Sequence, residues 1–372
     1  MIKNRNMRPL EIYIHIPFCV KKCNYCDFLS APSSETERQK YVESLCKKIR
    51  SYEEIAKAYR VISIFIGGGT PSILSGEQMK KIMEALKNTF FIDRAAEITV
   101  EMNPGTVTEA KLQIYKKLGI NRLSIGLQSV NNDELKILGR IHSYEEFLET
   151  FKLARKTGFC NINVDLISAV PGQTVDSWKH TLRTVAELEP EHISAYSLII
   201  EEGTPFYDLY GEKEVKAGIK KLPDEEEERQ MYQDTKKILL EYGFHRYEIS
   251  NYAKKGYECR HNLGYWERTE YLGIGTGAAS FMNHQRWVQD ETPEILSRQD
   301  EIEEYMFLGL RKMEGVSKKK FESEFSEAIE KVYGIVIENM KRQGLLEEEG
   351  DFVRLTERGI DVSNYVMSEF LL

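Results

Sequence analysis

The sequence predicts an α/β protein, namely a partial (β/α)6 barrel that resembles an incomplete TIM barrel, followed by a C-terminal helical module with a winged-helix-like pattern. Three observations lead to this prediction. Short apolar runs alternate with amphipathic stretches through the first two hundred residues, the alternation stops near Glu201, and a helix-rich segment begins near Gln299. Alternating strands and helices form parallel sheets with right-handed crossovers.

Apolar runs of strand length recur along the first part of the chain. They are Glu11–Ile16, Val61–Ile66, Glu97–Glu101, Arg122–Ile125, Ile162–Ile167 and Ile193–Ile200. Stretches with apolar residues at helical spacing separate them: Glu35–Tyr59, Gly76–Asn88, Glu109–Leu118, Ser143–Thr157 and Thr174–Leu188. A closed eight-stranded barrel is the alternative, but the number of units fits a partial barrel better. In either barrel, functional side chains gather at the carboxyl ends of the strands.

The pattern changes after Glu201. Residues 202–222 look like a loop, Asp224–Tyr242 predicts a long helix, and short strands or turns are expected at Phe244–Asn251 and Tyr271–Phe281. We therefore expect the barrel to span residues 1–215, an extension that caps it to span 216–298, and a separate domain to span 299–372.

The last domain has a helical pattern with a short strand pair near its end. Helices are expected at Glu301–Lys312, Ser317–Phe321 and Ala328–Gln343, a two-stranded wing at Leu345–Leu355, and a final helix at Thr356–Glu369. A winged helix can bind DNA, but residues 299–372 hold 10 Lys and Arg against 17 Asp and Glu. Since a DNA-binding domain needs the opposite sign, we interpret the module as a packing or partner domain.

Composition excludes several classes of protein. The chain has 372 residues, of which 41% are hydrophobic, so it is neither collagen-like nor disordered. Its net charge of −8 makes general binding of nucleic acid or of an anionic membrane improbable on electrostatic grounds. The sequence shows no signal peptide and no apolar run of the roughly 18 residues that span a bilayer, so we expect a cytoplasmic protein.

Three of the six cysteines stand in one short run, as Cys19, Cys23 and Cys26. Such clustering favours a metal or cluster site in a reducing compartment over disulfides. Three thiolates on one loop suit a 4Fe-4S cluster that keeps one iron open, whereas zinc usually takes four protein ligands. Zinc with a distant fourth ligand such as His15, or three inert thiols, are the alternatives. We expect Cys46 and Cys160 to be core residues and Cys259 to be an ordinary reduced thiol.

A glycine-rich turn and several polar residues follow the predicted strands. The run Gly67-Gly68-Gly69-Thr70 comes directly after Val61–Ile66, and glycines there allow close approach of a ligand to the backbone. Glu101, Gln128 and Asp165 lie within or directly after later strands. Single polar residues in apolar strands are costly unless they are paired, so each is either a hydrogen-bonded structural residue or a ligand contact.

The segment Tyr13–Phe28, with its three cysteines, resembles the cluster loop of radical S-adenosylmethionine (SAM) enzymes. More narrowly, it resembles the branch that contains oxygen-independent coproporphyrinogen III oxidases and haem chaperones of the HemW type. This resemblance implies a 4Fe-4S cluster on Cys19, Cys23 and Cys26. It also implies SAM contacts, which would be Tyr13, Tyr25, Gly68, Gly69, Thr70, Glu101, Gln128, Arg140 and Asp165.

Two features bear on the position within this branch. Phe28 stands where the resemblance leads us to expect a further cysteine in the decarboxylating oxidases, and only 18 residues precede Cys19. The run His261-Asn-Leu-Gly-Tyr265-Trp266 matches a pattern of the haem chaperones. A histidine is a common axial ligand of haem iron, and two aromatic rings can stack on a porphyrin. The alternative is a hydrogen-bonded histidine beside two core aromatics.

The resemblance therefore implies a haem chaperone that carries haem as cargo, uses a 4Fe-4S cluster and SAM, and delivers haem to apo-haemoproteins of the respiratory chain. A homodimer and peripheral membrane contact through partners are further expectations, and nucleic acid is not an expected partner. The alternatives are an oxygen-independent coproporphyrinogen III oxidase, which decarboxylates its substrate to protoporphyrinogen IX, and a radical enzyme with haem as substrate.

Overall fold

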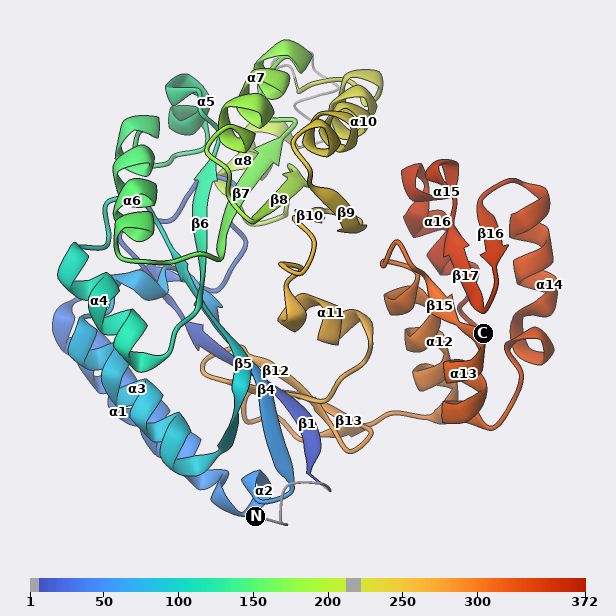
Figure 1. Ribbon diagram of the computed structural model, residues 1–372, viewed down its shortest axis with the longest axis horizontal. Helices are drawn as coiled ribbons and strands as arrows, with labels where there is room; N and C mark the ends of the chain where they lie inside the picture. The colour runs from blue at the N-terminus through green and yellow to red at the C-terminus, as the bar shows by residue number, and fades with distance from the viewer. Residues whose placement is uncertain (1–6, 212–221) are drawn as a thin grey trace.

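A computed structural model of the chain describes residues 7–211 and 222–372, so the expected domain boundary near residue 215 lies outside the described residues. The described strands form one twelve-stranded sheet and two small sheets (Figure 1). The order of the large sheet is β14-β13-β12-β11-β1-β4-β5-β6-β7-β8-β10-β9.

The centre of the large sheet is the predicted partial barrel. Its strands pair in parallel and in chain order: β1 (Arg8–Ile16), β4 (Tyr59–Gly68), β5 (Phe91–Met102), β6 (Arg122–Gln128), β7 (Ile162–Ser168) and β8 (His192–Ser197). The helices that connect them are α1 (Glu35–Ser51), α2 (Glu53–Ala56), α3 (Gly76–Thr89), α4 (Glu109–Leu118), α6 (Tyr144–Lys156) and α7 (Val175–Ala186). These helices cover the outer face of the sheet in Figure 1, which confirms the α/β architecture.

Local sequence explains where these helices begin. Ser34, Ser75 and Ser143 each form a capping box with the residue three positions later, which satisfies backbone N–H groups in the first turn. The C-terminus of α4 is closed by Gly119 in the left-handed conformation, with φ of 91°.

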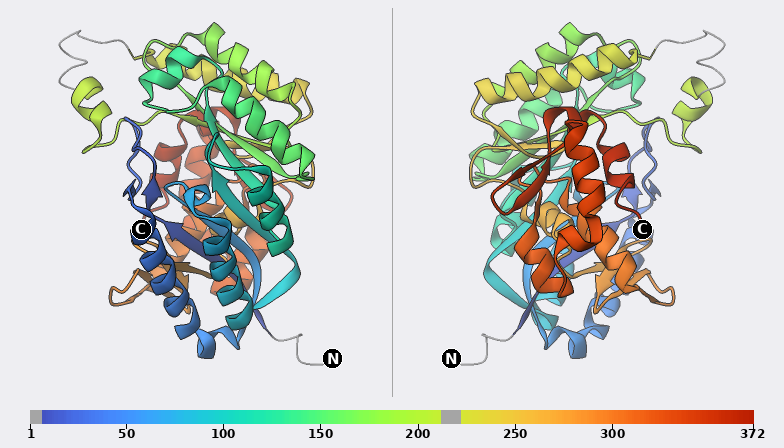
Figure 2. Two further views of the ribbon diagram at one scale, coloured as in Figure 1. Left: turned by 90° about the vertical axis from the view of Figure 1, so that its left-hand side faces the viewer. Right: turned by 90° about the vertical axis from the view of Figure 1, so that its right-hand side faces the viewer.

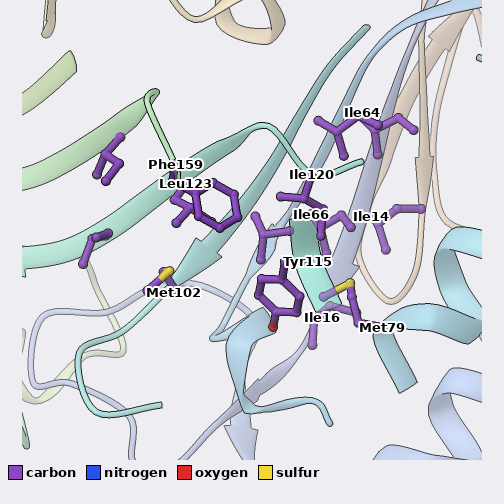
Figure 3. Packing of buried hydrophobic residues seen from close by; sticks show 14 of the residues in the cluster. Ile14, Ile16, Ile64, Ile66, Met79, Met102, Tyr115, Ile120, Leu123 and Phe159 are labelled. Atoms are coloured by element: carbon purple, nitrogen blue, oxygen red, sulfur yellow. The ribbon is translucent and has the colours of Figure 1, made fainter. Parts of the chain in front are cut away.

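Side chains alternate between the two faces of each barrel strand. In β1, Ile12, Ile14 and Ile16 are fully buried and belong to the core between sheet and helices. Figure 3 shows part of this core, where Met79 and Tyr115 from the helices lie beside Ile16. Because side chains alternate along a strand, Glu11, Tyr13 and His15 face the barrel interior. The interior is therefore polar, and it is where the candidate site lies.

Short elements that the sequence did not predict complete the first two hundred residues. They are η1 (Pro71–Ile73), α5 (Asn132–Ile137), α8 (Pro205–Tyr210), and the paired strands β2 (Phe18–Cys19) and β3 (Ala31–Pro32). The expected loop at 202–222 was thus wrong for α8, where Thr204 caps the helix and Pro205 occupies its first position.

The capping extension adds strands to both edges of the barrel. The predicted long helix is present as α10 (Glu225–Glu241), and β9 (His245–Glu248) and β10 (Asn251–Ala253) extend the edge at β8. At the other edge, β11 (Tyr271–Ile274) pairs in parallel with β1, and antiparallel strands follow it: β12 (Ala279–Met282), β13 (Gln285–Val288) and β14 (Glu294–Ile295). Between these groups, α11 (Arg260–Trp266) packs on the inner side of the sheet (Figure 1).

The C-terminal module has a hydrophobic core of its own. Its elements are α12 (Arg298–Gly309), β15 (Val316–Ser317), α13 (Lys318–Phe325), α14 (Ile329–Arg342), β16 (Leu346–Glu349), β17 (Phe352–Leu355), α15 (Glu357–Asp361) and α16 (Ser363–Ser368). The sheet order β15-β17-β16 beside these helices gives the winged-helix-like arrangement. Figures 1 and 2 show the module lying against the open side of the barrel, next to α11. No helix in the described ranges is long and apolar enough to cross a membrane.

Candidate cluster and ligand site

The cysteine loop leaves the barrel at the carboxyl end of β1 and is held there by the glycine-rich turn. The amide of Gly69 donates to the carbonyl of Ile16 at 2.9 Å, and the amide of Thr70 donates to the carbonyl of Phe18 at 2.7 Å. Cys19 is buried, whereas Cys23 and Cys26 are partly exposed. The three thiols therefore occupy the end of the barrel where functional groups were expected.

A chain of hydrogen bonds joins two of these sulfurs through the ends of neighbouring strands. The hydroxyl of Thr70 donates to Sγ of Cys19 at 3.4 Å, and Nη1 of Arg140 donates to Sγ of Cys23 at 3.5 Å. Asn103 links the two, because it donates to Oγ1 of Thr70 at 2.9 Å and accepts from Nη2 of Arg140 at 2.7 Å. Sequence reasoning missed Asn103, although it stands two residues after Glu101 at the end of β5.

The hydrogen bonds to Cys19 and Cys23 make these surroundings suitable for an iron–sulfur cluster. Thiolates on a 4Fe-4S cluster each bind a different iron, and hydrogen bonds to sulfur are a feature of such sites.

The glycine run gives the cysteine loop room to approach the barrel. A Cβ on Gly69 would lie 2.6 Å from the carbonyl oxygen of Phe18 and 3.0 Å from Sγ of Cys19. Gly68 has φ of +113°, and a Cβ there would lie 2.6 Å from the His15 ring. Both positions therefore require glycine, and a side chain at either would displace the loop.

Glu101 and Asp165 bring two carboxyl groups into the barrel below this turn. Glu101 accepts from the amide of Gly68 at 3.0 Å, and burial together with repulsion from Asp165 raises its pKa to about 8. Burial also raises the pKa of Asp165, which accepts hydrogen bonds from Ser124 at 2.9 Å and Asn163 at 2.7 Å. Buried acids whose pKa values are raised in this way are a common feature of functional sites.

Gln128 and Arg140 lie beside this pair. Gln128 ends β6 with φ of 79°, a left-handed conformation that is unusual for a residue other than glycine and is often found at ligand sites. Arg140 donates to the carbonyl of Gly126 at 2.7 Å, and a Cβ on Gly126 would lie 3.1 Å from Nε2 of Gln128. Gln128, Arg140 and the Cys23 sulfur therefore share one corner of the barrel mouth.

The two predicted tyrosines have different surroundings, since Tyr13 lies in β1 and Tyr25 lies in the cysteine loop. The Tyr13 hydroxyl lies 3.0 Å from Nδ1 of His15, whose Nε2 lies 3.0 Å from the carbonyl oxygen of Leu29. The ring of Tyr25 lies 6.5 Å from that of Phe206, in a small apolar cluster under α8. Both ring nitrogens of His15 thus have hydrogen-bond partners, and the contact with Leu29 holds the end of the cysteine loop.

His261 lies elsewhere, deep between α11 and the barrel. Only 1% of it is exposed, and both ring nitrogens are engaged: Nδ1 lies 2.8 Å from the Ser63 hydroxyl and Nε2 lies 3.1 Å from the Tyr265 hydroxyl. Burial lowers its pKa to about 3, so the ring is neutral. This arrangement matches the second interpretation of the sequence, a hydrogen-bonded histidine beside aromatic residues. For His261 to bind haem iron as an axial ligand, its ring would have to give up one of these two hydrogen bonds.

Tyr265 and Trp266, in contrast, line a cavity of about 570 Å³ between the barrel and the C-terminal module. The cysteine loop contributes Asp27, Phe28 and Leu29 to its wall. The remaining lining residues come from β1, the capping extension and α12: Tyr13, His15, Arg268, Tyr271, Gly277, Ala278, Ala279, Phe281, Arg286, Glu304 and Leu308. The cavity is thus rich in aromatic rings and borders the loop that carries Cys26.

The other three cysteines are not part of either site. Cys46 is buried in α1, and Cys259 is fully buried beside Glu97, where burial raises its pKa to about 12. The expectation that Cys160 is a core residue was wrong, because its side chain is exposed two residues before β7 begins.

Together the parallel partial barrel, the three-cysteine loop at its mouth and the glycine cradle define a radical SAM protein. The sequence model of the Radical SAM superfamily matches residues 13–185, and that of the HemN C-terminal domain matches residues 296–362. The chain belongs to this superfamily and, within it, to the family of the proteins named heme chaperone HemW.

The relatives that show this family match along nearly the whole chain. The heme chaperone HemW of Bacillus subtilis is 37% identical over 96% of this chain and 98% of its own length. Those of Lactococcus lactis and Escherichia coli are each 35% identical over 98% of both chains. Among solved structures, the E. coli coproporphyrinogen III oxidase HemN superposes with a TM-score of 0.84 at 22% identity, covering 99% of this chain and 92% of HemN. That likeness shows the fold alone.

Radical SAM proteins contain a 4Fe-4S cluster and SAM. When bound, the cluster supplies single electrons for chemistry that the cofactor carries, while the protein orients the groups and sets their electrostatics.

Proposed function

We propose that this chain is a haem chaperone, which binds haem in the aromatic cavity between barrel and C-terminal module and delivers it to apo-haemoproteins. The observation that carries this proposal is the cavity itself, whose wall holds the rings of Tyr265, Trp266, Tyr271 and Phe281. Flat aromatic walls suit a planar tetrapyrrole. The names of the relatives, heme chaperone HemW, support the same function.

We further infer that Cys19, Cys23 and Cys26 hold the cluster. The SAM contacts that the resemblance implies fit the barrel mouth: Gly68, Gly69, Thr70, Glu101, Gln128, Arg140 and Asp165, with Tyr13 and Tyr25 at the edge. Glu101 and Asp165 would face the positive charge of SAM, and Thr70 and Arg140 would donate to cluster sulfurs, as they now do to Cys19 and Cys23. Since Asp27–Leu29 line the cavity, the cluster loop touches both sites.

His261 supports this function by positioning Tyr265 through the contact between Nε2 and the tyrosine hydroxyl, 3.1 Å long. Its role as axial haem ligand stays a prediction. Recipients in the respiratory chain, a homodimer and membrane contact through a partner also stay predictions of the resemblance.

The experiment is haem titration of the anaerobically reconstituted protein, followed by transfer of the bound haem to an apo-haemoprotein. Trp266→Ala and Tyr265→Ala should each weaken haem binding about tenfold or more, since each removes a large aromatic contact. Tyr365→Ala is the matched control, because Tyr365 is 46% exposed on α16 and is not among the cavity residues. A Soret band that is unchanged in His261→Ala would exclude His261 as the iron ligand.

The same preparation tests the alternative function. Turnover of coproporphyrinogen III to protoporphyrinogen IX would show an oxidase and contradict the chaperone. Haem binding without transfer to any apo-haemoprotein would contradict delivery.

A further inference from the structure

The cavity has a cluster of charged residues where the capping extension meets α12. The carboxylate of Glu304 lies between two arginines there, with Oε1 2.6 Å from Nη2 of Arg286 and Oε2 3.4 Å from Nε of Arg268. All three residues line the cavity. Among the residues that line the cavity, these two arginines are the Lys or Arg side chains, so they are the cations with which an anionic group of a ligand could pair.

The two arginines are held very differently. The side chain of Arg268 is 4% exposed and has three acidic partners, because it also pairs with Glu324 at 3.0 Å and Glu301 at 3.5 Å. Such a buried guanidinium with three acidic partners joins the capping extension to the C-terminal module. Removing it would take a cation away from two carboxylates that are largely buried, those of Glu301 and Glu304, which are 14% and 7% exposed.

Arg286 is the more open of the pair. Its side chain is 39% exposed, and Glu304 is its acidic partner among the described ion pairs. Arg286 also donates a hydrogen bond to the Tyr271 hydroxyl, which lies in the same wall. A guanidinium presents five N–H donors in a planar fork, so these partners leave donors for a further acceptor.

We propose that Arg286 recognises a carboxylate of the ligand in this cavity and so makes the cavity selective for carboxylated planar rings. This inference rests on the proposed function, and it identifies the carboxylate as the part of the haem that Arg286 recognises. The aromatic wall would hold the ring, and the exposed part of the Arg286 fork would pair with a carboxylate at its edge. Glu304 would remain on Arg268, so recognition requires no break of the contact between the module and the barrel.

A purely structural role for Arg286 has a different consequence. In that case the pair with Glu304 only ties β13 to α12, and its loss would lower thermal stability without changing which ligands bind. The two roles are therefore separated by ligand selectivity, measured together with the melting temperature.

The test compares ferric haem with its dimethyl ester, which keeps the ring and iron but lacks both negative charges. Wild-type protein should bind haem about tenfold more tightly than the ester, as expected for one charge-assisted pair. Arg286→Gln should reduce this preference to near unity by weakening haem alone, and Arg286→Lys should retain part of it. Arg298→Gln, which removes a 61% exposed arginine paired with Glu327 outside the cavity, should leave the preference unchanged.

Three other results would contradict the role of Arg286, the selectivity of the cavity or the proposed function. If Arg286→Gln keeps the wild-type preference, Arg286 does not read the carboxylate, while the chaperone function stands. If the wild type binds haem and ester equally, the selectivity itself is absent and the inference is overturned. If the wild type binds neither, the proposed function fails and the inference fails with it.

Discussion

Arg140 reaches across the mouth of the barrel and donates from Nη1 to the sulfur of Cys23 at 3.5 Å. Its other terminal nitrogen is fixed by Asn103 and by the carbonyl of Gly126, both at 2.7 Å. The guanidinium therefore holds a positive charge, in a defined orientation, at the sulfur of Cys23, one of the three proposed cluster ligands. A positive charge and a hydrogen bond at sulfur both stabilise the reduced, more negative cluster.

Replacing Arg140 by Met should accordingly lower the reduction potential of the cluster. Loss of one hydrogen bond to a charged group, about 1.5–2 kcal/mol, corresponds to a drop of about 60–90 mV for a one-electron couple. A redox titration followed by electron paramagnetic resonance measures it. Lys136→Met removes a charge that is 76% exposed on α5 and should leave the potential nearly unchanged. Equal potentials in the Arg140 variant and the wild type would show that this contact does not tune the cluster.

The glycine cradle gives a prediction about assembly. Gly69→Ala places a methyl group 2.6 Å from the Phe18 carbonyl oxygen and 3.0 Å from the Cys19 sulfur, so the loop has to move. We expect an iron content several-fold below that of the wild type after reconstitution, and a stability loss of about 1–3 kcal/mol from overpacking. Gly334→Ala is the matched control in α14, where the added Cβ meets its nearest neighbour at 3.9 Å. That variant should keep its iron and gain stability by about 0.5–1 kcal/mol.

The sequence was informative where a pattern is long or repeated. The barrel strands and their helices were predicted because each carries many buried apolar residues at a fixed spacing, and α4 was placed at Glu109–Leu118 as observed. The helices α5, α8 and α11 were missed because six or seven residues are too few to show a helical period. Cys160 was misplaced because the residues just before a strand do not share its burial.

The candidate site divides in the same way. Cys19, Cys23 and Cys26 follow from their own spacing, and Gly69 follows from its neighbours. Asn103 and Arg286 could not be predicted in this way, because their roles depend on partners that lie far away in the chain. Asn103 joins Thr70 to Arg140, and Arg286 meets Glu304 only when α12 packs against β13. For His261, the sequence suggested a ligand, and only the packed structure shows that Ser63 and Tyr265 hold both ring nitrogens.

Glu101 gives a prediction about pH. Because its pKa is raised to about 8, the carboxyl group is mostly protonated at pH 7 in the protein without SAM. A cationic ligand favours the carboxylate, so the affinity for SAM should rise as pH increases toward 8 and level off above it. Glu101→Gln should bind SAM more weakly at pH 8 and lose this rise. Calorimetric titration at pH 6.5, 7.5 and 8.5 measures it, and the variant also corrects for titration of SAM itself. If the affinity for SAM depended on pH in the same way in both proteins, Glu101 would not be a SAM contact.

Glu11 gives the last prediction, which concerns the packing of α11 on the barrel. Its carboxyl group is fully buried, accepts from the Ser63 hydroxyl at 3.0 Å, and has Oε2 without a hydrogen-bond partner among the described residues. Gly264 packs so closely on it that a Cβ there would lie 2.2 Å from Oε1. Burial raises the pKa of Glu11 to about 9, which keeps a proton on the group in the folded protein at neutral pH.

The sign of the effect follows from proton binding. Between about pH 4.5 and 9 the unfolded chain releases the Glu11 proton while the folded protein keeps it, so the free energy of unfolding falls as pH rises through this window. Glu11→Gln keeps a neutral group of similar shape and removes this loss. Its stability relative to the wild type should therefore increase with pH, by at most about 1.4 kcal/mol per pH unit. Urea unfolding at pH 5 and pH 8 measures the difference, and Glu84→Gln on the exposed face of α3 should show none. A gap of equal size at both pH values would mean that Glu11 is ionised in the folded protein, and α11 would then pack on a buried charge.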